Sequence, residues 1–195
     1  VVIVIPGEEE LGEDQGQLFE QNFGAFDYRW TMKDTQFVTF YSANQNLSPR
    51  GLGSLQSSLR AMQSEDQRWR LGGQEEANTR ADVEATRALP AFAITHTPLF
   101  DPDGPREAGF QSRLQASRVA SLLSAAGVHT LFAGHILDNA HVTDTTPQLV
   151  LTTSQNTRLD DTLGTYRRIT ILDEATDETI PVARKHMLLE TLSIP

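Results

Sequence analysis

Short apolar runs along this chain predict the strands of a sheet. Residues 1–5 (VVIVI) are β-branched throughout, which is typical of a strand buried on both faces. Residues 36–41 (QFVTFY) predict a second strand, and the aromatic segment before them (FGAFDYRWTMKD) predicts a hairpin or an irregular lead-in. The run AFAIT after Pro90 predicts another buried strand, which ends at His96.

Apolar positions at helical spacing predict three helices. The first covers residues 52–70 and ends before Gly72-Gly73, because glycine disfavours a helix interior. The second, over residues 75–88, carries a thin stripe of alanines. The third is the clearest, since Gly127 stands where a C-cap glycine belongs. The apolar face of this third helix consists of Leu114, Val119, Leu122, Leu123 and Ala126.

The rest of the pattern predicts an α/β fold. VHTLFA follows the third helix as a strand, and the short spacing of three further strands at residues 148–153, 166–172 and 180–185 predicts an antiparallel meander. Strand, helix and strand alternate in the middle of the chain, which implies a parallel pair with a right-handed crossover. We expect one domain over residues 1–195. Because the chain begins inside an expected strand, we expect this domain to be the C-terminal part of a longer or processed polypeptide.

Charge and composition narrow the range of partners. The formal net charge of −10 argues against nucleic acid or an anionic membrane as the main partner. The absence of cysteine excludes disulfides and thiolate metal sites. No apolar run approaches the length of a membrane span. An acidic composition that is poor in Lys and rich in Thr and Gln favours an exported protein, periplasmic or extracellular.

Three polar loops follow predicted strands. They are Gly7-Glu8-Glu9-Glu10, Thr95-His96-Thr97-Pro98 and Gly134-His135-Ile136-Leu137. Ligands of parallel α/β sheets bind beyond the carboxyl ends of the strands, so neighbouring strands would turn these loops toward one cleft. A metal site is then one explanation of the acidic loop. The alternative is a solvated acidic loop beside hydrogen-bonded histidines, with no metal.

The segment AFAITHTPLFDP, followed by LLSAAGVHTLFAGHILDNAHV, resembles the calcineurin-like metallophosphoesterases, a family that includes the purple acid phosphatases. That family carries a GNHD loop, a later His before Pro-Leu, and a GHxH loop, each at a strand end. The resemblance implies a β-sandwich flanked by helices, in four layers (α/β/β/α), of which this chain forms the C-terminal portion. It also implies two divalent metals that activate water against a phosphate ester.

The chain departs from the family at its chemical positions. Glu8 stands where the family has a ligating Asn and can still bind a hard cation through oxygen. Glu9 replaces the family's His, and a carboxylate there repels an anionic phosphate. Leu137 stands where GHxH has its second His and offers a metal no lone pair. The family's Asp-x-His and Gly-Asp-x-x-Asp segments do not occur in this chain.

These departures favour one function over another. The favoured hypothesis is a catalytically impaired or non-catalytic metallophosphoesterase-like protein with a binding or assembly role. The alternative is an active divalent-metal phosphoesterase, completed by an N-terminal segment outside this chain. The expected partner is that segment or another protein chain, and the expected cofactor is a divalent metal or none. The resemblance places Glu8, His96 and His135 at ligand positions of the family, so these residues are candidate metal ligands. A third possibility is therefore a single-metal site formed by them, and mixed nitrogen and oxygen donors suit Zn, Mn or Fe.

Overall fold

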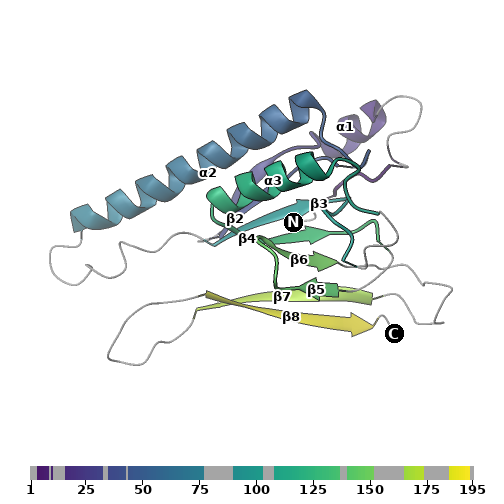
Figure 1. The fold of residues 1–195 in the computed structure, drawn as a ribbon. Coiled ribbons are helices and arrows are strands. Elements are labelled where there is room, and N and C mark those ends of the chain that lie inside the picture. Colours follow the sequence, from purple (N-terminus) through teal and green to yellow (C-terminus); the bar gives the residue numbers. More distant parts are fainter. Residues whose placement is uncertain are drawn as a thin grey trace.

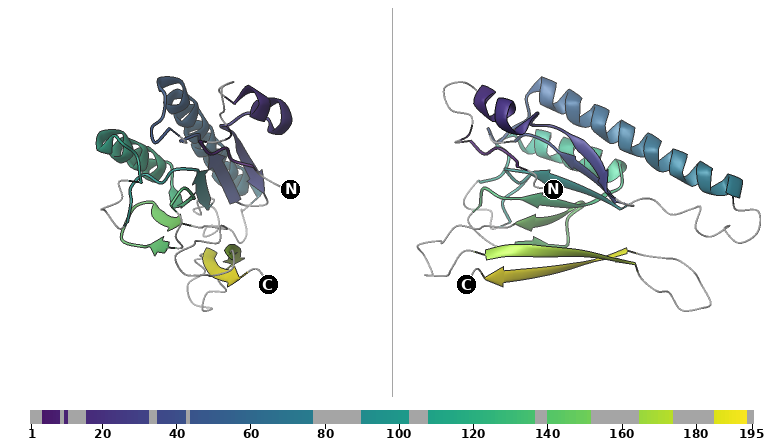
Figure 2. Two further views of the ribbon diagram at one scale, coloured as in Figure 1. Left: turned by 90° about the vertical axis from the view of Figure 1, so that its right-hand side faces the viewer. Right: turned by 180° about the vertical axis from the view of Figure 1, so that it is seen from behind.

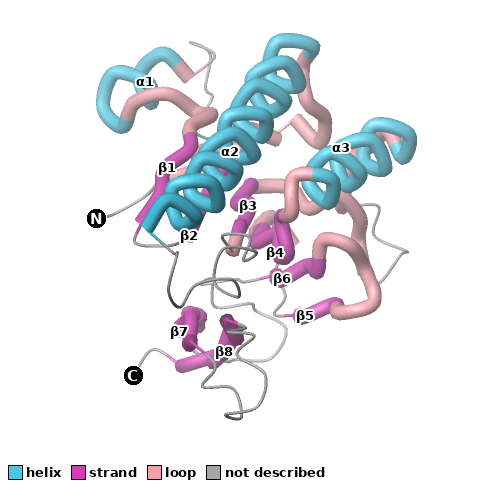
Figure 3. The backbone as a smooth tube through the Cα atoms, turned by 90° about the vertical axis from the view of Figure 1, so that its left-hand side faces the viewer, coloured by secondary structure: helices cyan, strands magenta, loops and turns pink. Residues whose placement is uncertain are grey.

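Six strands form one mixed sheet at the centre of the computed structural model (Figure 1). The structure describes residues 4–8, 10, 16–32, 35–42, 44–76, 90–102, 108–136, 140–151, 165–173 and 185–193. The two longer helices, α2 and α3, lie over one face of the sheet, and a separate two-stranded hairpin lies on the side away from them (Figure 2). The view in Figure 3 shows the same succession of layers. The α/β class predicted from the sequence is confirmed.

The sheet has a parallel centre and antiparallel edges. Its strand order is β1-β2-β3-β4-β6-β5, and the four inner strands are parallel. The outer strands β1 and β5 pair antiparallel with β2 and β6, so β1 and β2 form the predicted hairpin. The strands are β1 (Arg29–Met32), β2 (Thr35–Thr39), β3 (Ala91–Thr95), β4 (Val128–Ala133), β5 (Ala140–Val142) and β6 (Gln148–Leu151).

Two helices connect the parallel strands and contribute buried side chains to the core. Helix α2 (Pro49–Glu76) leads from β2 to β3, and α3 (Arg113–Ala125) leads from β3 to β4. Helix α2 packs on β2 through Leu55, Leu59 and Met62, which are all buried. A short helix, α1 (Gln17–Phe23), precedes β1. Among the described residues, no helix has both the length and the apolar character needed to cross a bilayer.

The boundary predicted within the α2 region is wrong. Helix α2 continues through Gly72-Gly73 to Glu76, because a glycine weakens a helix by about 1 kcal/mol relative to alanine without forbidding it. The second predicted helix, over residues 75–88, is outside the described residues except for its first two, which belong to α2.

The position predicted for helix α3 is confirmed, but the prediction that Leu114 lies on its apolar face is wrong. The Ser112 hydroxyl accepts a hydrogen bond from the Gln115 N–H at 3.2 Å and caps the first turn. Gly127 has the left-handed φ of 76° expected after a helix end. Leu123 is fully buried, but Leu114 is 84% exposed. Nine residues at about 100° each place Leu114 half a turn away from Leu123.

The C-terminal strands do not form the expected three-stranded meander. Strand β6 pairs with β4 and β5, whereas β7 (Thr165–Asp173) and β8 (Lys185–Ser193) form a separate antiparallel sheet. The predicted strand at residues 180–185 begins at Lys185, and residues 180–184 are outside the described part of the chain. The order of the strands along the chain therefore does not decide this pairing, because β6 completes the parallel sheet between β4 and β5.

The strand predicted at residues 1–5 is not found in its described part. Val4 and Ile5 belong to no strand, and Val4 is 37% exposed, while residues 1–3 lie outside the described residues. Strands β2, β3, β4 and β6 each already have neighbours on both sides. A further β-branched segment therefore finds no vacant central position in the sheet.

Candidate metal centre

Two histidines stand side by side beyond the parallel strands. His96 directly follows β3, and His135 lies two residues beyond the end of β4. Thr95 and Ala133, the last residues of these strands, are partners in the ladder. The ladder continues one step further, since the Gly134 N–H donates to the His96 carbonyl oxygen at 3.0 Å. The spacing of the two imidazoles is therefore fixed by backbone pairing.

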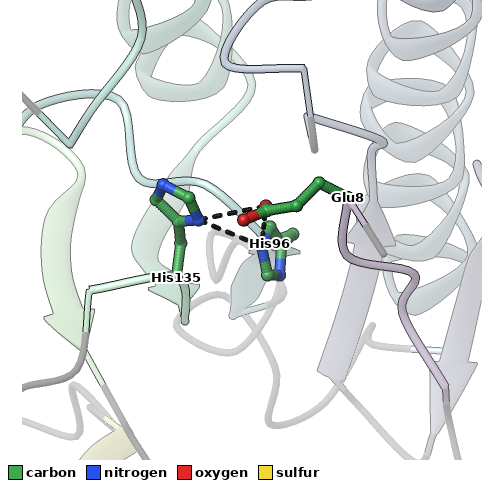
Figure 4. A group of neighbouring side chains, drawn as sticks. All are labelled: Glu8, His96 and His135. Atoms are coloured by element: carbon green, nitrogen blue, oxygen red, sulfur yellow. Dashed lines mark hydrogen bonds and ion pairs between the residues drawn. The ribbon is translucent and has the colours of Figure 1, made fainter. Parts of the chain in front are cut away.

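Glu8 completes a cluster of three donor side chains (Figure 4). The distance from His96 Nε2 to Glu8 Oε2 is 2.8 Å, and that from His135 Nδ1 to Glu8 Oε2 is 3.2 Å. His135 Nδ1 lies 3.2 Å from His96 Nε2, and the two rings meet edge to face. The predicted proximity of these three side chains is confirmed.

The backbone at His135 adopts a conformation that is rare outside glycine. His135 has a φ of 63°, and the Ile136 N–H donates to the Gly134 carbonyl at 2.7 Å, which closes a three-residue γ-turn around His135. Strained conformations of this kind cluster at binding and active sites. The turn directs the His135 imidazole toward Glu8 and His96 (Figure 4).

Gln45 is a neighbour of the cluster that the sequence did not reveal. Its side-chain amide nitrogen lies 3.5 Å from His135 Nε2, the ring nitrogen on the far side from Glu8. Gln45 has a left-handed φ of 56°, and together with His135 it makes up the non-glycine residues of positive φ in the described chain. A turn sequence such as ANQNLS carries no signal for this contact, which depends on the tertiary fold.

Glu8 is held as a carboxylate by its neighbours. Burial by itself raises the pKa of Glu8, but the hydrogen bond from His96 and the charges of His135 and His96 outweigh it, so the pKa lies below its ordinary value. The loop is further fixed where the Glu10 carboxylate accepts a hydrogen bond from the Gly7 N–H at 2.8 Å. Glu9 and Leu137, the other positions at which the chain departs from the family, lie outside the described residues.

The carboxylates of Glu8 and Glu10 act on a neighbouring tyrosine. Burial and the charges of Glu8 and Glu10 raise the pKa of Tyr41 to about 12. The Tyr41 hydroxyl is buried and has no hydrogen-bond partner among the described residues. The charges of these two carboxylates would also repel a phosphate and attract a cation.

The donor set fits one divalent metal ion. Two imidazole nitrogens and a carboxylate oxygen suit Zn, Mn or Fe. Ligand atoms bound at about 2.1 Å lie roughly 3.0–3.4 Å apart in octahedral or tetrahedral geometry. The distances of 2.8, 3.2 and 3.2 Å found here are close to that spacing. The described side chains could therefore hold an ion with three ligands and leave further coordination positions open.

Comparisons with known proteins do not assign a family to this chain. No family model and no curated protein matches it. Among solved structures it is similar to GAP50, described as the anchor in the inner membrane complex of Plasmodium, with 15% sequence identity and a TM-score of 0.38. The match covers 67% of this chain and 39% of the GAP50 chain, so this chain spans well under half of that protein.

Proposed function

We propose that this chain is a metallophosphoesterase-like protein that binds one divalent transition metal ion in a binding or assembly role. The single observation that carries the proposal is the convergence of Glu8, His96 and His135, whose ligand atoms all lie within 4.8 Å of one another. Three loops that are distant in sequence supply these atoms, and two of them leave neighbouring parallel strands. The metal ion would hold these loops together and present its open positions to a partner.

The scaffold is also part of the proposal. The order of the three loops supports a relationship to the metallophosphoesterases. In that scaffold the β7–β8 hairpin would contribute to the second sheet of a four-layer sandwich. A preceding segment or another protein chain would supply the remaining strands and would be the partner of the assembly.

Electrostatics supports a binding role over phosphate ester hydrolysis. Glu8 belongs to the cluster and Glu10 lies beside it, and the charges of both carboxylates contribute, after burial, to the raised pKa of Tyr41. Glu9 and Leu137 replace two histidines that the family's reaction uses. These carboxylates would therefore repel an anionic substrate. The family offsets such repulsion with two metal ions, whereas the described residues of this chain offer donors for one.

A second candidate function is a divalent-metal phosphoesterase completed by an N-terminal segment. The observation that favours it is the number of donors, because three described side chains could hold a metal ion and catalytic metal sites keep three protein ligands and an exchangeable position. Glu8 is half exposed, so water reaches this side of the centre.

Metal titration tests both functions. Isothermal titration with Zn²⁺ and Mn²⁺ should show one site per chain, and His96→Ala or His135→Ala should weaken binding by on the order of 100-fold or more. His129→Ala is the matched control, since His129 is an exposed histidine on β4 outside the cluster, and it should bind metal as the wild type does. Absence of metal binding would refute the proposal.

An activity assay separates the two functions. The metal-loaded protein is expected to hydrolyse p-nitrophenyl phosphate no faster than the His96→Ala variant. Hydrolysis that needs both the metal ion and His96 would instead establish the second candidate and reject the binding role.

A further inference from the structure

A cleft opens beside the metal centre. Its volume is about 680 Å³, within the range of small-molecule sites, about 300–1,000 Å³. One wall is the chain around Leu99, Phe100 and Phe110, and the other is the first half of α3. Gln45 lines the cleft and also contacts His135, so the cleft and the metal centre share a side chain.

The walls of this cleft are held in place before any ligand binds. The Gln111 N–H donates to the Gln45 carbonyl at 2.9 Å, and the Gln111 amide donates to Gln45 Oε1 at 3.1 Å. A side chain at Gly109 would place its Cβ 2.7 Å from the Phe100 Cα, so only glycine permits this approach of two backbone segments. A preformed cleft binds a ligand without the cost of ordering its walls.

Among the described residues, the lining combines an apolar floor with one cation. Leu99, Phe110 and Ala116 are buried and form the apolar part. The Arg113 side chain lines the cleft at the start of α3, and its guanidinium group makes no hydrogen bond or ion pair with any residue in the described ranges. The Asp101 carboxylate, the other charged group of the lining, already accepts a hydrogen bond from the Ala108 N–H at 3.4 Å.

We propose that this cleft binds a small molecule with an apolar body and a carboxylate. The carboxylate would accept paired hydrogen bonds from Arg113, whose planar guanidinium matches it. The apolar body would cover Leu99, Phe110 and Ala116, and the end nearest Gln45 would lie beside the metal centre. This ligand class specifies the proposed binding role further. Only the presence of a metal ion beside the cleft rests on the proposed function.

Phenylacetate and phenylacetamide test this inference as probes of equal shape and different charge. Both are titrated into chelator-treated protein and followed by amide chemical shifts, so that direct coordination of the carboxylate to metal is excluded. Phenylacetate should bind at the cleft with a Kd on the order of 1 mM, and phenylacetamide about 10-fold more weakly.

Two arginine variants make the test specific. Arg113→Gln should weaken phenylacetate binding by about 10-fold and leave phenylacetamide binding unchanged. Arg118→Gln is the matched control, because Arg118 is also exposed on α3 but does not line the cleft, and its affinity should equal that of the wild type. Equal binding of the two probes, an Arg113→Gln variant with wild-type affinity, or no saturable shift at cleft residues would each overturn the inference.

Metal titration of the same samples distinguishes the two proposals. Protein that binds Zn²⁺ but not phenylacetate retains the proposed function and loses the carboxylate site. Protein that binds phenylacetate through Arg113 but takes up no metal loses the proposed function and retains the cleft.

Discussion

Gly7→Ala should damage the metal centre without removing any donor atom. A Cβ at Gly7 would lie 2.9 Å from His96 Cε1 and 3.0 Å from Glu10 Oε2. Gly7 does not have a left-handed backbone, so alanine is compatible with its conformation and crowding is the only obstacle.

The size of the effect follows from these distances. Carbon atoms in contact prefer a separation of about 3.5–4.0 Å, so the imidazole must move by roughly 0.6–1.1 Å. A metal site tolerates errors of about 0.2 Å in its ligand distances. We therefore expect the affinity for Zn²⁺ to fall on the order of 10- to 100-fold, the loss typical of a displaced ligand. Crowding in the loop should lower the free energy of unfolding by about 1 kcal/mol.

Isothermal titration measures the affinity, and chemical denaturation measures the stability of the same samples. Gly53→Ala is the control, because nothing lies within 4 Å of its added Cβ on α2. That change should raise the free energy of unfolding by about 0.5–1 kcal/mol and leave Zn²⁺ affinity unchanged. If Gly7→Ala binds Zn²⁺ as tightly as the wild type while His96→Ala does not, the crowding argument is wrong.

Two further predictions concern stability. Burial raises the pKa of Asp27, although the hydrogen bond from the Tyr41 N–H opposes the shift. The folded state therefore binds the Asp27 proton more tightly than the unfolded state does. The free energy of unfolding should fall as the pH rises from about 4 through the raised pKa. Asp27→Asn keeps an acceptor for Tyr41 and should remove that fall in urea denaturation followed over pH 3–7, whereas an unchanged pH profile would contradict it. Leu123→Ala should cost about 2–5 kcal/mol because Leu123 is fully buried, and Leu114→Ala, on the opposite face of α3, should stay within about 0.5 kcal/mol. Similar losses in the two variants would refute the face assigned to the helix.

Local pattern was sufficient to predict the middle of the fold. The apolar runs of β3 and β4 are bounded by turn residues, and α3 has both a capping serine and a terminal glycine. Loops that leave neighbouring parallel strands must emerge at one edge, so the proximity of His96 and His135 followed from the strand assignment alone.

The features that could not be predicted depend on contacts between segments that are separated in the sequence. The run at residues 1–5 has strand propensity, but propensity does not say which sheet position is free. Likewise, β6 pairs with β4, from which β5 separates it in the chain, rather than with β7, its successor in the chain. The contact of Gln45 with His135 depends on the left-handed backbone conformation of both residues and on their proximity in the fold. Neither residue type predicts that conformation from the sequence.

The different anchoring of the three ligands has a consequence for the rate of metal exchange. His96 and His135 follow paired strands at the centre of the sheet, where local opening is most costly. Glu8 belongs to no described helix or strand and is half exposed. If the cluster binds a metal ion as proposed, the two nitrogens would capture it first, and the carboxylate would close afterwards and open first. The residence time of the ion would then be governed by the segment around Glu8, and chain contacts that restrain that segment would slow metal release without altering the imidazoles.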